Sequence, residues 1–136
     1  MSTAASPELV RFVRDVLGCG CPDDVVDRTV VDRSRCGEPG LDVGGRLLVR
    51  VLESTDPDRL VASLPGIVAR LRGERDRRGF NRVRLVVVSA GHDGLQSALR
   101  ARLKALAETD DRVHIHVVDP DIMPRSLVGA AAADAP

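Results

Sequence analysis

Three cysteines are the side chains in this sequence with the most distinctive chemistry and spacing. Cys19 and Cys21 form a Cys-x-Cys pair directly ahead of a helix start at Pro22, and Cys36 stands alone. Backbone N–H groups and the positive end of a helix dipole favour the thiolate, which attacks substrates and binds metal ions. Free cysteine is also among the most buried residue types. The pair is therefore interpreted either as part of a metal or redox site or as two small packed side chains.

Further ligands follow two predicted strands. His92 and Asp93 lie in a glycine-bracketed turn after residues 82–89, and Asp119 follows residues 112–118. In open parallel sheets, ligands sit beyond the carboxyl ends of the strands. Asp93 also has the spacing of a helix N-cap, which explains it without a ligand. His92 has no such structural explanation and is the histidine we single out for function.

One edge of the sheet is expected to bring these groups together. If residues 28–33 pair as an antiparallel hairpin with residues 46–53, the first strand begins at the edge where the parallel strands end. The sequence then predicts a metal site with four ligands, Cys19, Cys21, His92 and Asp119. Zinc or an iron–sulfur cluster suits a site that contains thiolates.

Two more histidines alternate along the last predicted strand. His114 and His116 share one face of residues 112–118, a spacing that also suits a metal ion. The apolar residues between them give a simpler interpretation, which we favour. The strand has one buried face and one face that is solvated or touched by a helix.

Arginine carries nearly all the positive charge, since Lys104 is the only lysine. The excess of arginine over lysine indicates either sites that bind oxyanions in a bidentate manner or a GC-rich coding bias. Five arginines crowd the end of a predicted helix, where they could bind phosphate or complement the helix terminus: Arg70, Arg72, Arg75, Arg77 and Arg78. Twenty basic residues balance twenty acidic ones, and Trp and Tyr are absent. Both facts speak against nucleic acid as a partner.

The pattern of apolar residues predicts a single α/β domain over residues 1–127, with an Ala-rich, frayed tail at 128–136. Residues 82–89 are apolar on both faces, as is typical of a central strand. The element order α-β-β-α-β-α-β predicts a four-stranded, mostly parallel mixed sheet with flanking helices. Helices are expected at 7–17, just after Pro22, at 57–78 and at 94–108, and strands at 28–33, 46–53, 82–89 and 112–118.

Two segments carry signals that interrupt regular structure. The stretch 34–44 is rich in Gly, Ser and Pro and is predicted to be a loop. Pro65 lies inside the apolar pattern of residues 57–78 and is expected to kink or split that helix.

The segment Leu17-Gly18-Cys19-Gly20-Cys21-Pro22-Asp23-Asp24-Val25, preceded by an amphipathic helix, resembles a group of small prokaryotic proteins of unknown activity. Those proteins open with a Cys-x-Cys-Pro-acid-acid-Val motif. The resemblance covers about the first thirty residues and, loosely, the strand RLLVRVLE. It implies that the two cysteines are a family feature and carries no activity with it.

Three functions remain open. The first is a thiolate-based metal or iron–sulfur module at Cys19 and Cys21, the second a non-catalytic interaction domain, and the third a thiol-dependent enzyme or redox protein. Whether the chain forms homo-oligomers or binds a protein partner is open as well. No apolar run approaches the ~20 residues that span a bilayer, so no membrane partner is expected. Residues 1–7 lack signal-peptide features, which predicts a cytoplasmic protein.

Overall fold

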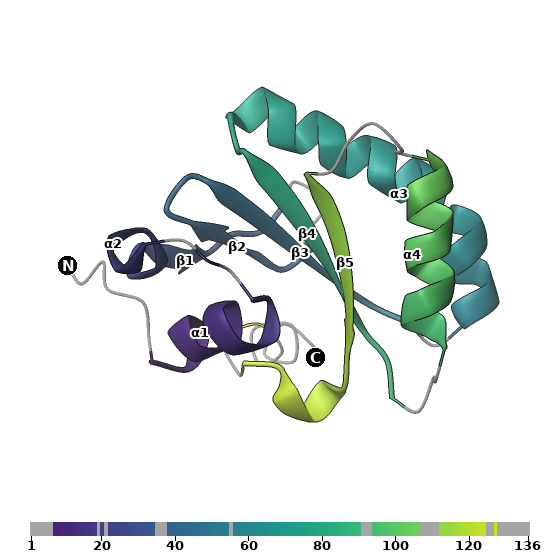
Figure 1. The fold of residues 1–136 in the computed structure, drawn as a ribbon, viewed down its shortest axis with the longest axis horizontal. Helices are drawn as coiled ribbons and strands as arrows, with labels where there is room; N and C mark the ends of the chain where they lie inside the picture. The colour runs from purple at the N-terminus through teal and green to yellow at the C-terminus, as the bar shows by residue number, and fades with distance from the viewer. Residues whose placement is uncertain are drawn as a thin grey trace, which may run out of the picture.

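The computed structural model describes residues 7–18, 20, 22–34, 38–54, 56–90, 94–106, 112–124 and 127. It is an α/β structure with one open, mixed sheet of five strands and helices on both faces (Figure 1). In chain order the elements are α1 (Pro7–Arg11), the π-helical turn η1 (Phe12–Val16), α2 (Asp23–Val26), β1 (Thr29–Val31), β2 (Gly40–Val43), β3 (Leu47–Glu53), α3 (Pro57–Arg78), β4 (Arg82–Val88), α4 (Leu95–Leu106), β5 (Val113–Val118) and the 3-10 turn η2 (Pro120–Ile122).

The strands lie in the order β1-β2-β3-β4-β5. β2 is antiparallel to both β1 and β3, whereas β3, β4 and β5 are parallel to one another. The prediction of four strands, with the first paired on the second as a hairpin, is therefore wrong. Because β2 lies between them, β1 runs parallel to β3, and β1 begins at the amino edge of the sheet rather than at the carboxyl edge.

The additional strand β2 comes from the stretch 34–44, which was predicted to be a loop. Leu41 and Val43 are fully buried and alternate with the half-buried Asp42, as a strand requires. This alternation is too short to outweigh the Gly, Ser and Pro signals around it. Gly40 lies opposite Arg50 of β3 in the register. A glycine inside a strand lets neighbouring atoms approach its backbone closely.

β4 is the central strand of the parallel part, as its apolar run predicted. Val86 and Val88 face the core on the side of α1, while Val83, Leu85 and Val87 face the core beneath α3 and α4. β4 pairs along its length with β3 and over six residues with β5. β4 therefore contributes side chains to two hydrophobic cores, one on each face of the sheet. α1 lies over one face, and α3 and α4 lie over the other (Figure 1).

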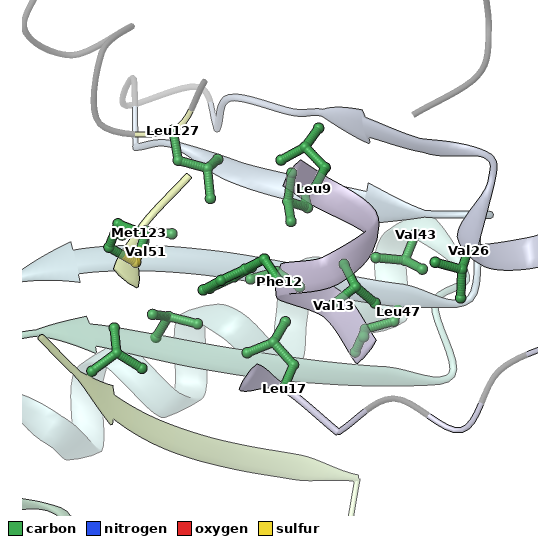
Figure 2. Packing of buried hydrophobic residues seen from close by; sticks show 14 of the residues in the cluster. Leu9, Phe12, Val13, Leu17, Val26, Val43, Leu47, Val51, Met123 and Leu127 are labelled. Carbon is green, nitrogen blue, oxygen red and sulfur yellow. The ribbon is translucent and has the colours of Figure 1, made fainter. Parts of the chain in front are cut away.

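The helical segment near the N-terminus covers the first of these cores. Leu9, Phe12, Val13 and Leu17 are buried, which confirms the predicted amphipathic helix, although its second half is π-helical. Figure 2 shows these side chains packed over the strands, beside Val43, Leu47 and Val51 and close to Met123 and Leu127. Gly18 follows with a φ of 65°, the left-handed conformation that ends a helix.

The long helix α3 is continuous through Pro65, so the predicted split does not occur. The side chain of Asp56 accepts a hydrogen bond from the Arg59 amide at 3.2 Å and caps the start of the helix. An apolar stripe packs on the sheet on both sides of the proline: Leu60, Leu64, Val68 and Leu71. Tertiary packing of this stripe outweighs the one hydrogen bond that Pro65 removes.

We expect Gly40→Ala to destabilise the protein. A Cβ at Gly40 would lie 2.0 Å from the Val49 carbonyl oxygen and 2.6 Å from Arg50 Nη1, so backbone would have to move. A loss of roughly 1–3 kcal/mol in the free energy of unfolding is expected, measured by urea denaturation. The matched control is Gly73→Ala, where an added Cβ meets nothing within 4 Å on α3. That change should stabilise the protein by about 0.5–1 kcal/mol, and equal effects at both positions would contradict the prediction.

Candidate functional site

Most of the predicted metal ligands lie outside the described residues. This applies to Cys19, Cys21 and His92, and also to Cys36 and Asp93, so the metal site stays a prediction. Asp119 is described: it is exposed, follows the end of β5 and precedes η2 without capping it by its side chain. Among the described residues, no three His, Cys, Asp or Glu side chains are grouped closely enough to hold a metal ion.

The hairpin on which the shared edge was based does not form, because β2 lies between β1 and β3. Gly20 and Pro22, the chain neighbours of the two cysteines, line a pocket with Arg46 and Asn81 at the amino ends of β3 and β4. Asp119 follows the carboxyl end of β5, at the opposite edge. The reason is the inserted strand β2, which reverses the direction expected for β1.

The pocket beside Gly20 is strongly cationic. Its volume is about 330 Å³, and Arg46, Arg82 and Arg84 contribute to its lining together with Asn81. None of the described residues that line it is acidic. Among the described residues, neither Arg46 nor Arg82 is in an ion pair, and both are exposed. Among the described residues, the guanidinium groups of Arg46 and Arg82 therefore face this pocket without an ion-pair partner.

Backbone hydrogen bonds fix the positions of two of these arginines. The carbonyl oxygen of Arg46 accepts from the amides of Asn81 and Arg82, at 2.8 and 3.2 Å. Leu47 then pairs with Arg82 in the parallel register of β3 and β4. The starts of two neighbouring strands are thus joined, which sets the arginine side chains beside each other on an ordered backbone.

The surface of the sheet becomes polar toward the same edge. On the face that carries Val86, Val88 and Val118, the positions nearer the amino ends are Arg84, His114 and His116. His114 and His116 do share a face, as predicted, and both are half-buried on the outermost strand β5. The favoured interpretation of these histidines as part of an edge strand is confirmed.

His116 is held in contact with the arginine pocket. Arg84 Nη1 lies 2.8 Å from His116 Nε2, and because a guanidinium can only donate, the imidazole accepts. Burial, together with the charges of Arg84, Arg100 and His114, lowers the pKa of His116 to about 4. The ring is therefore neutral at pH 7, with its proton on Nδ1, and it positions the Arg84 side chain.

A second polar cluster is buried on the other face of the sheet. Arg50 of β3 has no exposed surface, and its guanidinium donates to Glu74 Oε1 and Oε2 at 3.1 and 2.5 Å. It also donates to the carbonyl oxygen and Oδ1 of Asp32, at 2.6 and 3.0 Å. Arg78 binds both carboxylates from the surface side. This cluster ties β1, β3 and α3 together.

The two carboxylates of this cluster are stabilised in their charged form. The hydrogen bond from Arg78 lowers the pKa of Asp32, and the hydrogen bond from Arg50 lowers the pKa of Glu74. Other arginines of the same helix also find carboxylates, since Arg70 pairs with Glu38 and Arg75 with Asp76. The arginines at the end of α3 thus serve mainly internal ion pairs, in contrast to those at the amino edge.

Both arginine clusters correspond to a recognisable pattern in the sequence. Arginine stands at the head of each of the three neighbouring parallel strands, at Arg46, Arg82 and Arg112, where the amino ends of the strands meet. Arg50 is the one charged residue within the apolar run LLVRVL. A charge in a strand buried on both faces requires a partner, and this predicts a buried ion pair.

Comparisons with known proteins add no relatives: no family model, curated protein or solved structure matches the chain. The resemblance at residues 17–25 therefore stays a prediction. Within the described part of the chain, no helix is both long and apolar enough to cross a membrane.

Glu74→Gln should destabilise the protein, because it leaves the buried Arg50 guanidinium with less compensating charge. We expect a loss of about 3 kcal/mol in the free energy of unfolding. The lowered pKa of Glu74 contributes stability above its unfolded pKa of about 4.5, and this contribution disappears as the pH falls through the folded value. The acid limb of the stability curve should therefore be shallower in the variant.

Urea denaturation from pH 7 to pH 3 measures both effects. Arg77→Gln is the control, because Arg77 is exposed on the same helix. It should change stability by less than about 0.5 kcal/mol. Similar losses in the two variants would show that the cluster is not a structural element.

Proposed function

We propose that this protein binds a small anionic molecule in the pocket at the amino edge of the sheet. The observation that carries the proposal is the set of three arginines that line one pocket, where no described lining residue is acidic. The chain as a whole has no net charge, so this concentration of positive charge is local. A local field of one sign raises the concentration of an oppositely charged ligand.

The shape and chemistry of the pocket support a phosphate or carboxylate group as the bound part. Guanidinium groups donate two parallel hydrogen bonds to such oxyanions. The Asn81 amide adds a neutral donor, and Leu47 and Pro22 supply apolar walls. A volume of about 330 Å³ lies at the small end of the range for ligand sites. The ligand is therefore a small organic anion rather than a macromolecule.

Removing one pocket arginine should weaken the binding of inorganic phosphate. Arg82→Gln is expected to raise the Kd about tenfold, because one charge-assisted hydrogen bond is lost. Kd is measured by NMR titration in low-salt buffer at pH 7, in which the backbone amides of Asn81 and Arg82 should shift. Raising the salt concentration should weaken binding in the parent more than in the variant.

The control for this experiment is Arg102→Gln, which removes the same charge from an exposed position on α4. It should leave the Kd almost unchanged. Arg82→Lys keeps the charge but not the planar donor pair, so an intermediate Kd is expected. The proposal fails if the parent does not bind phosphate, or if the Arg82 and Arg102 variants weaken binding equally.

Thiol chemistry at Cys19 and Cys21 is the second candidate function. It is favoured by the position of Gly20 and Pro22, the chain neighbours of the cysteines, on the arginine-lined pocket. Neighbouring arginines lower the pKa of a thiol and favour the thiolate. The same positive charges oppose an added metal cation, so a reactive thiol is better supported than a zinc or iron–sulfur site.

Metal content separates the two forms of this second candidate. We expect protein purified anaerobically and without a tag to contain no stoichiometric metal by mass spectrometry. The reason is the cationic character of the pocket that Gly20 and Pro22 line. The control is Cys19→Ser/Cys21→Ser. Near-stoichiometric zinc or iron in the parent and none in this double variant would contradict the expectation and establish a thiolate metal site.

A further inference from the structure

We propose that the anion site extends across β4 to the edge of β5 as a second cationic subsite, so that its ligand carries two oxyanion groups. This inference rests on the proposed function and names the class of ligand for the same site. The ligand is a small molecule bearing two phosphate or two carboxylate groups within reach of one another.

Arg84 joins the two subsites. It lines the pocket at the amino edge and also a second pocket of about 310 Å³ beside β5. The second pocket adds three basic side chains, Arg100, His114 and His116. None of the described residues that line it is acidic, as in the first pocket. The two pockets are therefore neighbours with Arg84 between them, and together they are called the cationic groove, defined by the residues that line them.

Each part of the groove comes from a different element. Arg84 is a β4 residue, His114 and His116 lie on β5, and Arg100 lies on α4. α4 is anchored to β5, because the Gln96 side-chain oxygen accepts a hydrogen bond from the Val117 amide at 2.9 Å. This contact holds the helix against the outermost strand and keeps Arg100 at the second pocket.

Two oxyanion groups match this arrangement better than one. Arg46 and Arg82 line only the first pocket and Arg100 lines only the second, so a small anion in one pocket leaves the charges of the other unmatched. The imidazole of His116 accepts from Arg84 and prevents that side chain from rotating away when the groove is empty. His116 is therefore a positioning residue at the junction of the subsites.

An anion in the second subsite also changes the protonation of His116. Burial is the main cause of the lowered pKa of His116, and the charges of the groups that face the ring, Arg84, Arg100 and His114, act in the same direction. A bound anion offsets their charges, so the pKa of His116 rises from about 4 toward its ordinary value. Binding between about pH 4 and pH 6.5 is then coupled to proton uptake by this ring.

The test compares inorganic phosphate with pyrophosphate, by isothermal titration calorimetry at pH 7. The parent should bind pyrophosphate at least about tenfold more tightly than phosphate. Arg100→Gln should remove this advantage and leave the Kd for phosphate unchanged, whereas Arg82→Gln should weaken both. Arg102→Gln, at an exposed position of α4 that does not line the described pockets, is the matched control and should change neither. The same comparison is made with acetate, which has one carboxylate, and succinate, which has two. It shows whether the groove prefers carboxylates or phosphates.

The number of protons taken up on ligand binding is a second measurement. If His116 had only a structural role, this number would not differ between the parent and a His116 variant. Pyrophosphate binding is measured at pH 5.5 in buffers of different ionisation enthalpy. The parent should take up more protons than His116→Gln, and protonation of the ligand itself cancels in this comparison. Equal uptake would overturn the role given to His116.

The outcomes separate the two proposals. If Arg82→Gln weakens phosphate binding but Arg100→Gln and Arg102→Gln bind pyrophosphate equally well, the second subsite is wrong and the proposed function stands. If the parent binds neither phosphate nor pyrophosphate, both are wrong. Selective loss of the pyrophosphate advantage in Arg100→Gln supports both.

Discussion

Arg50 lies within the sheet with no exposed surface, and its guanidinium is bonded to Glu74 of α3 and to Asp32 after β1. A buried charge is tolerated only when it is paired and its donors are satisfied. These bonds constrain the elements around them: α3 must cross β3 at Glu74, and β1 must end near Arg50. Gly40 must lack a side chain, since the guanidinium passes over it. The arrangement of β1, β2, β3 and α3 depends on this one cluster.

The placement of β2 between β1 and β3 has a consequence for function. It makes β1 parallel to β3, so the segment that leads into α2 and β1 approaches the amino edge of the sheet. That segment contributes Gly20 and Pro22 to the pocket in which Arg46, Arg82 and Arg84 meet. The buried ion cluster on one face therefore helps to define a cationic pocket on the other.

The two arginine clusters differ in what their charges do. Around Arg50 and Arg78, carboxylates lie within hydrogen-bond distance, and the charge serves stability. At the amino edge, Arg46 and Arg82 take part in no ion pair among the described residues, and the charge is directed to solvent. A chain of zero net charge thus separates structural arginines from those that face a pocket. Local charge, rather than the total, is the useful guide to the ligand.

The sequence by itself determined the elements with strong periodicity. The amphipathic segment ending at Leu17, the long helix α3, the doubly buried strand β4 and the shared face of His114 and His116 follow from apolar spacing, which is a local property. Only the tertiary structure decided that residues 40–43 form a strand, because their pairing with β3 and the fit of Gly40 against Arg50 are long-range contacts. The direction of β1, and with it the edge at which the Gly20 segment lies, followed from that one pairing. The cationic groove escaped prediction for the same reason: its arginines and histidines are far apart in sequence and meet only when three strands and α4 are assembled.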